Sequence, residues 1–217
     1  MEHVIVAIDG PAASGKSSVA RFLAQRLGFV YVNTGEIYRA VTWFLLEAGA
    51  VPGNPEAVQA LLAGAVVECA VEEGRSVVRV NGRNPGAALV DPAVTAAVSA
   101  VASLPEVRAR LLALQRDFGN RCDTVMEGRD IGSVVFPQTP YKFYVDASEE
   151  VRTARRARQG LDDVIAQRDR QDSTRAVAPL VVPEGAYRID SSEMTVEQVA
   201  EEIIGQLHHK GLPCAAR

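Results

Sequence analysis

The chain has 217 residues, of which 47% are hydrophobic and 23% charged, a composition typical of a soluble globular protein. Its net charge of −4 argues against a general nucleic-acid binder, because such proteins need an excess of phosphate-neutralising charge. The scattered residues Cys69, Cys122 and Cys214 show neither disulfide-framework nor metal-ligand spacing, which favours a reducing cytoplasm. No apolar run approaches the ~20 residues that span a bilayer, and the N-terminus reads as a strand rather than a signal peptide. These features predict a cytoplasmic protein that binds neither nucleic acid nor membranes.

The first predicted elements are a strand, a glycine-rich loop and a helix. Residues 4–8 form a short, continuous and β-branched run, which is typical of a strand buried on both faces of a parallel sheet. Residues 10–17, with the sequence GPAASGKS, follow as the loop. Apolar residues then recur at helical spacing over residues 19–27, and Gly28 supplies a C-terminal stop.

The loop matches the pattern G-x-x-x-x-G-K-[ST], whose glycines let backbone N–H groups surround a phosphate chain. The positive end of the following helix dipole would point at the same place. Lys16 would reach the β and γ phosphates, and the Ser17 hydroxyl would ligate Mg²⁺. The alternative is a plain glycine-rich turn with an exposed lysine. The predicted nucleotide-binding residues are Gly10, Pro11, Ala12, Ala13, Ser14, Gly15, Lys16, Ser17 and Ser18.

Downstream of this unit the pattern predicts a strand over residues 29–32 and a helix through residues 43–46. Asn54 and Pro55 are typical of an N-cap and a first helical position. Residues 65–80 alternate between apolar and polar around a Glu-Glu-Gly turn, which predicts a small antiparallel hairpin. A hairpin that interrupts a β/α pattern suggests an inserted subdomain.

The β/α rhythm then returns. Two helices are predicted to begin at Asp91-Pro92 and at Pro105, and strands are predicted over residues 123–127 and 141–146. An arginine-rich helix capped by Ser148 and a strand over residues 187–190 follow. The Thr195–Gln198 capping box begins the last predicted helix. About five strands with intervening helices predict an α/β fold with a parallel, doubly wound sheet.

Two groups of residues are candidates for an acceptor site opposite the loop. Thr34 and Arg39, after the second predicted strand, offer a hydroxyl and a guanidinium suited to a phosphate monoester. Glu127, Arg129 and Asp130 lie just beyond the third strand, where open α/β sheets bind ligands. The alternatives are a helix cap with a surface charge for the first group and a local ion pair in a turn for the second. Their combination with the phosphate loop favours phosphate binding.

Positive charge is concentrated in residues 151–175, which hold seven arginines and four aspartates. Such a run is ordinarily a solvated helix face or a polyanion patch. In a chain that carries a phosphate loop, it is also a candidate for a segment that closes over phosphates.

The motifs GPAASGKSS, NTGEIYR, SAVASLPEVR, EGRDIGSVVFP, KFYVDAS and RDRQDSTRAVAPL, in this order, resemble the bacterial cytidylate kinase family over nearly the whole chain. The resemblance implies transfer of the γ-phosphoryl group of ATP to CMP or dCMP, with Mg²⁺, and no partners beyond these small molecules. It also implies a single P-loop kinase domain with a five-stranded parallel sheet flanked by helices. The implied parts are a core (1–32, 104–150 and 176–217), a nucleoside-monophosphate-binding region (33–103) with an inserted small antiparallel sheet (about 62–90), and a short arginine-rich lid (151–175).

The resemblance further implies a role for individual residues. The implied catalytic residues are Lys16, Arg129, Asp130 and Arg175; Arg155 and Arg156 would contact ATP from the lid; and the CMP site would comprise Thr34, Arg39, Ser99, Arg108, Arg129, Asp130, Arg168, Asp172 and Arg175. These residue types suit the ligand, because a carboxylate can accept from the N4 amino group of cytosine while arginine and serine donate to N3 and O2.

The chain departs from the family in two places. Glu127 stands where the family commonly has Asp, and the lid is short, with only residues 159–167 between its two arginine groups. One alternative function is that of a P-loop kinase for another small acceptor, either a different nucleoside monophosphate or shikimate. Another is that of a nucleotide-dependent switch without an acceptor. Because no further interface motif is present, a monomer is expected.

Overall fold

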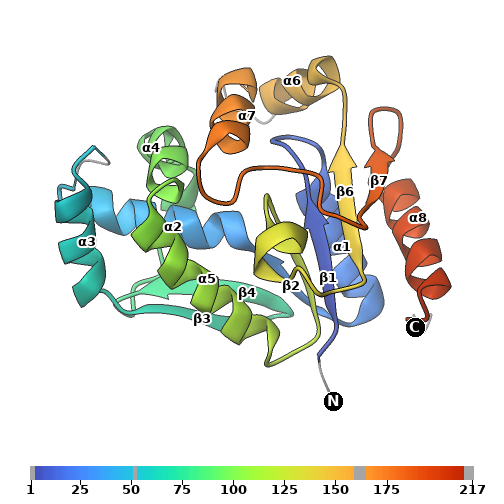
Figure 1. Cartoon of the computed structure of the whole chain (residues 1–217), viewed down its shortest axis with the longest axis horizontal. Helices are drawn as coiled ribbons and strands as arrows, with labels where there is room; N and C mark the ends of the chain where they lie inside the picture. Colours follow the sequence, from blue (N-terminus) through green and yellow to red (C-terminus); the bar gives the residue numbers. More distant parts are fainter. Residues whose placement is uncertain (1–2, 51–52, 159–164, 213–217) are drawn as a thin grey trace.

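Figure 1 shows the computed structural model, which describes residues 3–50, 53–158 and 165–212. A twisted sheet runs through the centre, and helices cover both of its faces. The strands are β1 (Ile5–Asp9), β2 (Val30–Asn33), β3 (Val67–Glu72), β4 (Arg75–Val80), β5 (Thr124–Gly128), β6 (Lys142–Asp146) and β7 (Tyr187–Asp190). The helices are α1 (Lys16–Leu27), α2 (Thr34–Glu47), α3 (Pro55–Gly64), α4 (Pro92–Ala102), α5 (Pro105–Gly119), α6 (Glu149–Arg158), α7 (Ile165–Thr174) and α8 (Val196–His209).

The sheet has the order β3-β4-β2-β5-β1-β6-β7. The five strands β2, β5, β1, β6 and β7 are parallel to their neighbours and correspond to the five that the sequence predicts. The expected five-stranded sheet is wrong, however, because the described residues form a seven-stranded one.

The two additional strands come from the hairpin that was expected to form a separate subdomain. Tyr31 of β2 pairs with Arg75 of β4, and the Tyr31 N–H donates to the Gly74 carbonyl at 2.9 Å. Edge strands carry unsatisfied backbone groups, so the β2 edge is a ready place for the hairpin to pair. The hairpin therefore extends the main sheet.

Two apolar clusters hold helices against the two faces of the sheet. Ala7 of β1 contributes to the cluster beneath α2, α3, α4 and α5. Its neighbours Val6 and Ile8 contribute to the cluster beneath α1 and α8. This alternation is the two-residue period of a strand, and it confirms that β1 is buried on both faces.

Several helices begin or end at the capping residues that the sequence predicts. Gly28 ends α1 in the left-handed conformation, with φ of 69°. The Asn54 side chain caps α3 by accepting from the Ala57 N–H at 3.1 Å. Thr195 and Gln198 form the expected capping box. No helix in the described ranges is both long enough and apolar enough to cross a membrane.

Parallel strands bring their carboxyl ends to one edge of the sheet, which is where doubly wound folds bind ligands. Asp9 at the end of β1 is in register with Gly128 of β5, and Asn33 of β2 is in register with Glu127. The glycine loop, the start of α2 and the segment after β5 therefore share that edge. Helices α6 and α7 lie above it (Figure 1).

Candidate active site

A cavity of about 790 Å³ lies at the carboxyl edge of the sheet. Its walls come from the glycine loop and α1, the start of α2, α4, the end of β5, helices α6 and α7, and the segment after β7. The residues among them that the sequence predicts are Ala12, Ala13, Gly15, Lys16, Ser17, Ser18, Thr34, Arg39, Ser99, Arg108, Glu127, Arg129, Asp130, Arg155, Arg156, Asp172 and Arg175. One cavity thus brings together both predicted halves of the site.

The glycine loop has the backbone that its sequence predicts. A Cβ on Gly10 would lie 2.0 Å from the Val145 carbonyl oxygen, so only glycine fits between β1 and β6 at this point. Gly15 is left-handed, with φ of 88°, and leads directly into α1. The buried Lys16 lies over the loop, and its Nζ donates to the Pro11 carbonyl at 2.9 Å. Gly10, Pro11 and Ser14 are buried and are not among the residues of the cavity wall.

The start of α2 brings Thr34 and Arg39 to the opposite side of the cavity. Asn33 caps this helix, because its Oδ1 accepts from the Glu36 N–H at 3.2 Å. Thr34 instead donates its hydroxyl to the Glu127 carbonyl at 2.8 Å, which joins α2 to the end of β5. Arg39 donates to the Leu89 carbonyl at 2.8 Å.

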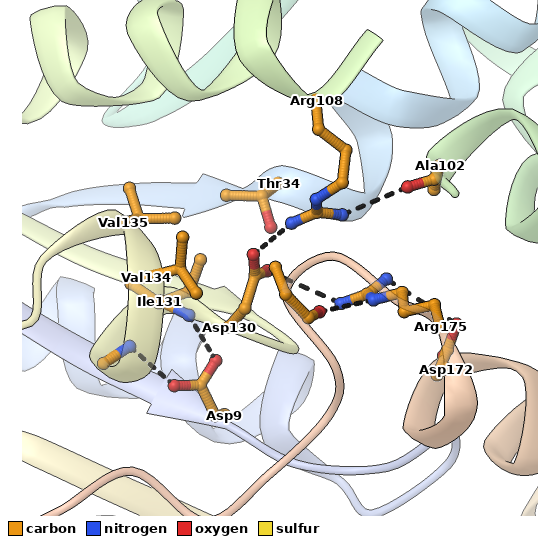
Figure 2. A network of polar contacts seen from close by, with 12 residues as sticks. Asp9, Thr34, Ala102, Arg108, Asp130, Ile131, Val134, Val135, Asp172 and Arg175 are labelled. Atoms are coloured by element: carbon orange, nitrogen blue, oxygen red, sulfur yellow. Dashed lines mark hydrogen bonds and ion pairs between the residues drawn. The ribbon is translucent and has the colours of Figure 1, made fainter. Parts of the chain in front are cut away.

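Asp130 lies at the centre of a buried group of arginines and aspartates (Figure 2). Its carboxylate accepts a hydrogen bond from Arg108 Nη2, and Arg108 Nη1 donates to the Ala102 carbonyl at 3.2 Å. Burial raises the pKa of Asp130, while the neighbouring Arg108, Arg175 and Arg129 act to lower it. This group can therefore recognise a polar ligand with both a carboxylate and guanidinium groups.

The other half of this group lies between β5 and helix α7. Arg129 Nε donates to Asp172 Oδ2 at 2.9 Å. Arg175 Nη2 lies 3.9 Å from Asp130 Oδ1, and Arg175 Nη1 lies 3.9 Å from Asp172 Oδ1. Arg175 Nη2 is buried and makes no hydrogen bond with any residue that the structure describes. A buried donor in this condition is suited to an anionic oxygen of a ligand.

Helices α6 and α7 contact the phosphate loop through Ala12. Arg152 of α6 and Asp169 of α7 form an ion pair, in which both side chains are largely buried. The Ala12 N–H donates to Asp169 Oδ1 at 3.2 Å, and Arg152 Nη1 donates to the Ala12 carbonyl at 3.3 Å. Arg155 donates to the Ser191 hydroxyl at 3.0 Å, and that hydroxyl donates to the Ser14 carbonyl at 2.8 Å. The predicted lid residues 159–164 and the side chain of Arg168 lie outside the described part of the structure.

Glu127 is a largely buried residue of the cavity wall, and its Oε1 accepts from the Tyr31 hydroxyl at 3.0 Å. Burial, with the charge of Glu127 as a further cause, raises the pKa of Tyr31. No three acidic, cysteine or histidine side chains of the described residues are grouped as metal ligands would be.

The structure adds four residues that the sequence analysis missed: Asp9, Arg152, Asp169 and Ser191. Asp9 directly precedes the glycine loop, and its carboxylate accepts from the Ile131 N–H at 2.8 Å and the Gly132 N–H at 2.7 Å. Asp169 lies within the RDRQD stretch that also holds Asp172. The contacts of Asp9 and Asp169 join distant parts of the chain, so no local pattern predicts them. In the sequence, the one sign of a role for either aspartate is its place beside or within a recognised motif.

A phosphate loop and an arginine-rich pocket that share the carboxyl edge of a parallel sheet define the class of P-loop kinases. The family model described as cytidylate kinase matches residues 6–209. The cytidylate kinase of Nocardia farcinica (strain IFM 10152) is 42% identical over 212 residues, which are 92% of this chain and 91% of that protein. The chain belongs to the cytidylate kinase family.

A second relative is longer. The bifunctional pantoate ligase/cytidylate kinase of Synechococcus sp. (strain CC9311) is 45% identical over 92% of this chain, which spans 43% of the length of that protein. A crystal structure of an uncharacterized protein from Eubacterium ventriosum ATCC 27560 has a TM-score of 0.52 and 12% identity, covering 95% of this chain and 99% of that one. That likeness supports the fold alone.

Proposed function

We propose that the chain transfers the γ-phosphoryl group of ATP to CMP or dCMP, which gives ADP and CDP or dCDP. The observation that carries this proposal is the buried Arg108–Asp130 pair in the same cavity as Lys16. The phosphate loop suits many nucleotide donors, whereas a buried carboxylate between guanidinium groups suits a particular base. The family membership and the relatives named above support the same assignment.

The base of CMP would be read by Asp130, Arg108 and Ser99. Cytosine presents an N4 amino donor and acceptors at N3 and O2. The Asp130 carboxylate can accept from N4, and Arg108 and Ser99 can donate to the two acceptors. Because Asp130 is buried, a base that offers it no donor would leave its carboxylate poorly satisfied.

The phosphate groups would be held by arginines from three different elements. Arg39 of α2 and Arg129 after β5 are assigned to the CMP phosphate, and Arg175 after α7 to the transferred group. Arg168 and Asp172 are assigned to the ribose and phosphates. Phosphoryl transfer requires alignment and positive charge around the moving group rather than a covalent partner on the protein. The buried Nη2 of Arg175 supports this assignment, because it has no hydrogen-bond partner among the described residues.

Mg²⁺ is the proposed metal, and the residues present are compatible with it. Ser17 and Glu127 both line the cavity and offer the oxygen ligands that Mg²⁺ prefers. When bound, the ion would neutralise charge on the triphosphate oxygens. Lys16 and the loop N–H groups would hold the phosphate chain, and Arg155 and Arg156 would contact ATP from the lid.

The division into core, acceptor-binding region (33–103) and lid (151–175) is part of the same proposal. Arg39 and Ser99 support the second assignment, because both line the cavity from that region. The contacts of α6 and α7 with Ala12 support the lid. We further propose a monomer in a reducing cytoplasm, with ATP and CMP or dCMP as its partners. The free thiols of Cys69 and Cys122 support the reducing location, while Cys214 lies outside the described residues.

The test is incubation of the protein with ATP and Mg²⁺ and, separately, with CMP, dCMP, UMP, AMP, GMP or shikimate. We expect ADP and the matching diphosphate to form fastest with CMP or dCMP, as measured by chromatography. Faster phosphorylation of another acceptor would identify a different kinase. Slow ATP hydrolysis with no phosphorylated acceptor would instead identify a nucleotide switch.

A further inference from the structure

The segment after Asp130 folds as a π-helical turn, η2 (Ile131–Val135). The Val135 N–H donates to the Asp130 carbonyl at 3.1 Å, and the Phe136 N–H donates to the Ile131 carbonyl at 2.7 Å. Both bonds span five residues, which is the π-helical pattern. Such turns are rare in proteins as a whole, and those that occur are often found at functional sites. Their backbone is less stable than that of an α-helix. A π-helical turn next to Asp130 therefore needs support from the surrounding structure.

Asp9 supports the amino end of this turn. Figure 2 shows its carboxylate beneath the turn, where Oδ1 accepts from the Ile131 N–H at 2.8 Å and Oδ2 accepts from the Gly132 N–H at 2.7 Å. Asp9 has no exposed surface, and each carboxylate oxygen is already engaged by the backbone. Burying a carboxylate is costly, so its position here is explained by what these two bonds hold in place.

Arg116 of α5 supports the carboxyl end of the same turn. Its Nε donates to the Val135 carbonyl at 2.9 Å, and its Nη2 donates to the Val134 carbonyl at 2.8 Å. A negative side chain thus contacts the N–H end of η2, and a positive one contacts its carbonyl end. Both charges complement the direction of the backbone dipole.

We propose that Asp9 and Arg116 are positioning residues, which clamp the two ends of η2 and thereby place Asp130 and Arg129 for the acceptor. This inference rests on the proposed function. Asp9 also directly precedes Gly10 of the phosphate loop, so one residue fixes the acceptor-reading segment relative to the donor loop. The clamp acts through Asp130 and Arg129, because the Asp9 carboxylate has no exposed surface and each of its oxygens already accepts from a backbone N–H.

The principal test is Arg116→Gln, because Arg116 is exposed and its replacement removes the contacts at the carboxyl end of η2 without opening the core. The matched control is Arg121→Gln, an exposed arginine just beyond the same helix that donates to the carbonyls of Asp117 and Cys69. We expect kcat/KM for CMP to fall by about tenfold in Arg116→Gln, the usual scale for lost charged hydrogen bonds, with KM for ATP unchanged within about twofold. Arg121→Gln should retain the wild-type values.

Asp9→Asn tests the other end of η2. The carboxamide keeps one acceptor oxygen but turns an NH₂ group toward the second backbone N–H, so kcat/KM for CMP should fall further than in Arg116→Gln. The melting temperature of each variant separates positioning from stability. A lowered melting temperature with wild-type kinetics in Arg116→Gln would overturn the clamp, as would an equal rise in KM for ATP and for CMP.

The same assays on the wild-type protein distinguish failure of the proposed function from failure of the clamp. If the wild type prefers another nucleoside monophosphate, the proposed function fails. The clamp is then tested with that acceptor, against which Arg116→Gln should show the same selective loss. A wild-type protein that phosphorylates no acceptor at all would overturn both.

Discussion

Arg175 has one buried donor atom, Nη2, that lacks a hydrogen-bond acceptor among the described residues. Its guanidinium is largely buried, and its Nη2 forms no hydrogen bond within the described structure, although Asp130 lies at 3.9 Å. Burial lowers the pKa of Arg175, yet arginine stays protonated in proteins, so the charge remains. A buried donor without an acceptor costs about 1–3 kcal/mol. A phosphate oxygen placed at this nitrogen would recover part of that free energy on binding.

Asp130→Asn tests the assignment of base recognition. The amide keeps the shape of the side chain but presents a donor that can pair with O4 of uracil and not with N4 of cytosine. We expect kcat/KM for CMP to fall by at least about tenfold, and the preference for CMP over UMP to narrow or reverse. The measurement is kcat/KM for both monophosphates.

The matched control for this variant is Asp172→Asn, which removes the other carboxylate of the same arginine group. Its activity should fall without a change in the CMP/UMP ratio, because Asp172 is assigned to the ribose and phosphates. If the two variants shift this ratio equally, Asp130 has no special part in reading the base.

At the scale of the elements, α6 and α7 are anchored to the phosphate loop at Ala12, through its N–H and its carbonyl. Arg152 of α6 contacts the Ala12 carbonyl and Asp169 of α7 contacts the Ala12 N–H, while the two side chains pair with each other. Ala13, the next residue, is left-handed with φ of 57°, a conformation that costs alanine about 1–2 kcal/mol. The lid contacts thus support the strained part of the loop.

A double-mutant cycle measures this coupling. Arg152→Ala and Asp169→Ala should each lower the free energy of unfolding, and the double variant should lose less than the sum of the two. We expect a coupling energy of about 1–2 kcal/mol, since both partners share Ala12 as a contact. The measurement is denaturant unfolding of the four proteins.

The exposed pair Arg26–Glu201, between α1 and α8, is the control for this cycle. Both of its side chains are about half exposed, so its coupling should stay within roughly 0.2–1 kcal/mol. A lid coupling no larger than that of this pair would show that α6 and α7 are held to the loop by other contacts.

Sequence patterns located the elements better than they located the pairings between them. The hairpin over residues 65–80 follows from its alternation and its Glu73-Gly74 turn, in which both residues have positive φ. Its docking against β2 does not follow, because the pairing of Tyr31 with Arg75 depends on how the whole sheet is assembled. The π-helical turn η2 has no periodic signature over its five residues and was missed for that reason.

The same distinction applies to the site. The phosphate loop is a contiguous motif, so chemistry and spacing are enough to find it. The contact of Asp9 with Ile131 joins residues 122 positions apart, and no local pattern encodes it. The assignments of Arg108 and Ser99 came from the family resemblance, since an arginine and a serine on two different helices carry no recognisable spacing.

At the scale of the whole molecule, the buried carboxylates make stability depend on pH. Burial raises the pKa of Asp9 from 3.8 to about 7, despite the opposing effect of the Gly132 and Ile131 N–H groups and of Lys16. Above about pH 7 Asp9 is the carboxylate that accepts from these two N–H groups, whereas below about pH 7 the folded protein takes up a proton on Asp9 that the unfolded chain binds only near pH 4. Between about pH 4 and pH 7 the free energy of unfolding should consequently decrease as the pH rises, and above about pH 7 this contribution should be constant.

The expected slope from Asp9 is at most about 1.4 kcal/mol per pH unit. Burial raises the pKa of Asp130 as well, and this acts in the same direction. Denaturant unfolding of wild type and Asp9→Asn across pH 4.5–8 is the measurement, with the slope reduced in the variant. Parallel pH profiles for the two proteins would assign the pH dependence to other groups.

The position of β1 in the sheet also affects how the chain is made. Both neighbours of β1 lie late in the sequence, since Ile5 pairs with Thr124 of β5 and Ala7 pairs with Lys142 of β6. At synthesis rates of roughly 5–20 residues per second, a ribosome needs about 6–24 s to reach β5, and throughout this time the apolar strand lacks both of its neighbouring strands. In the nascent chain Asp9 is hydrated and charged, and a charge beside a β-branched run opposes premature strand association. Light scattering during refolding of Asp9→Asn and wild type would compare this protection directly, and equal scattering would exclude it. The carboxylate that is costly in the folded core would then protect the chain before it folds.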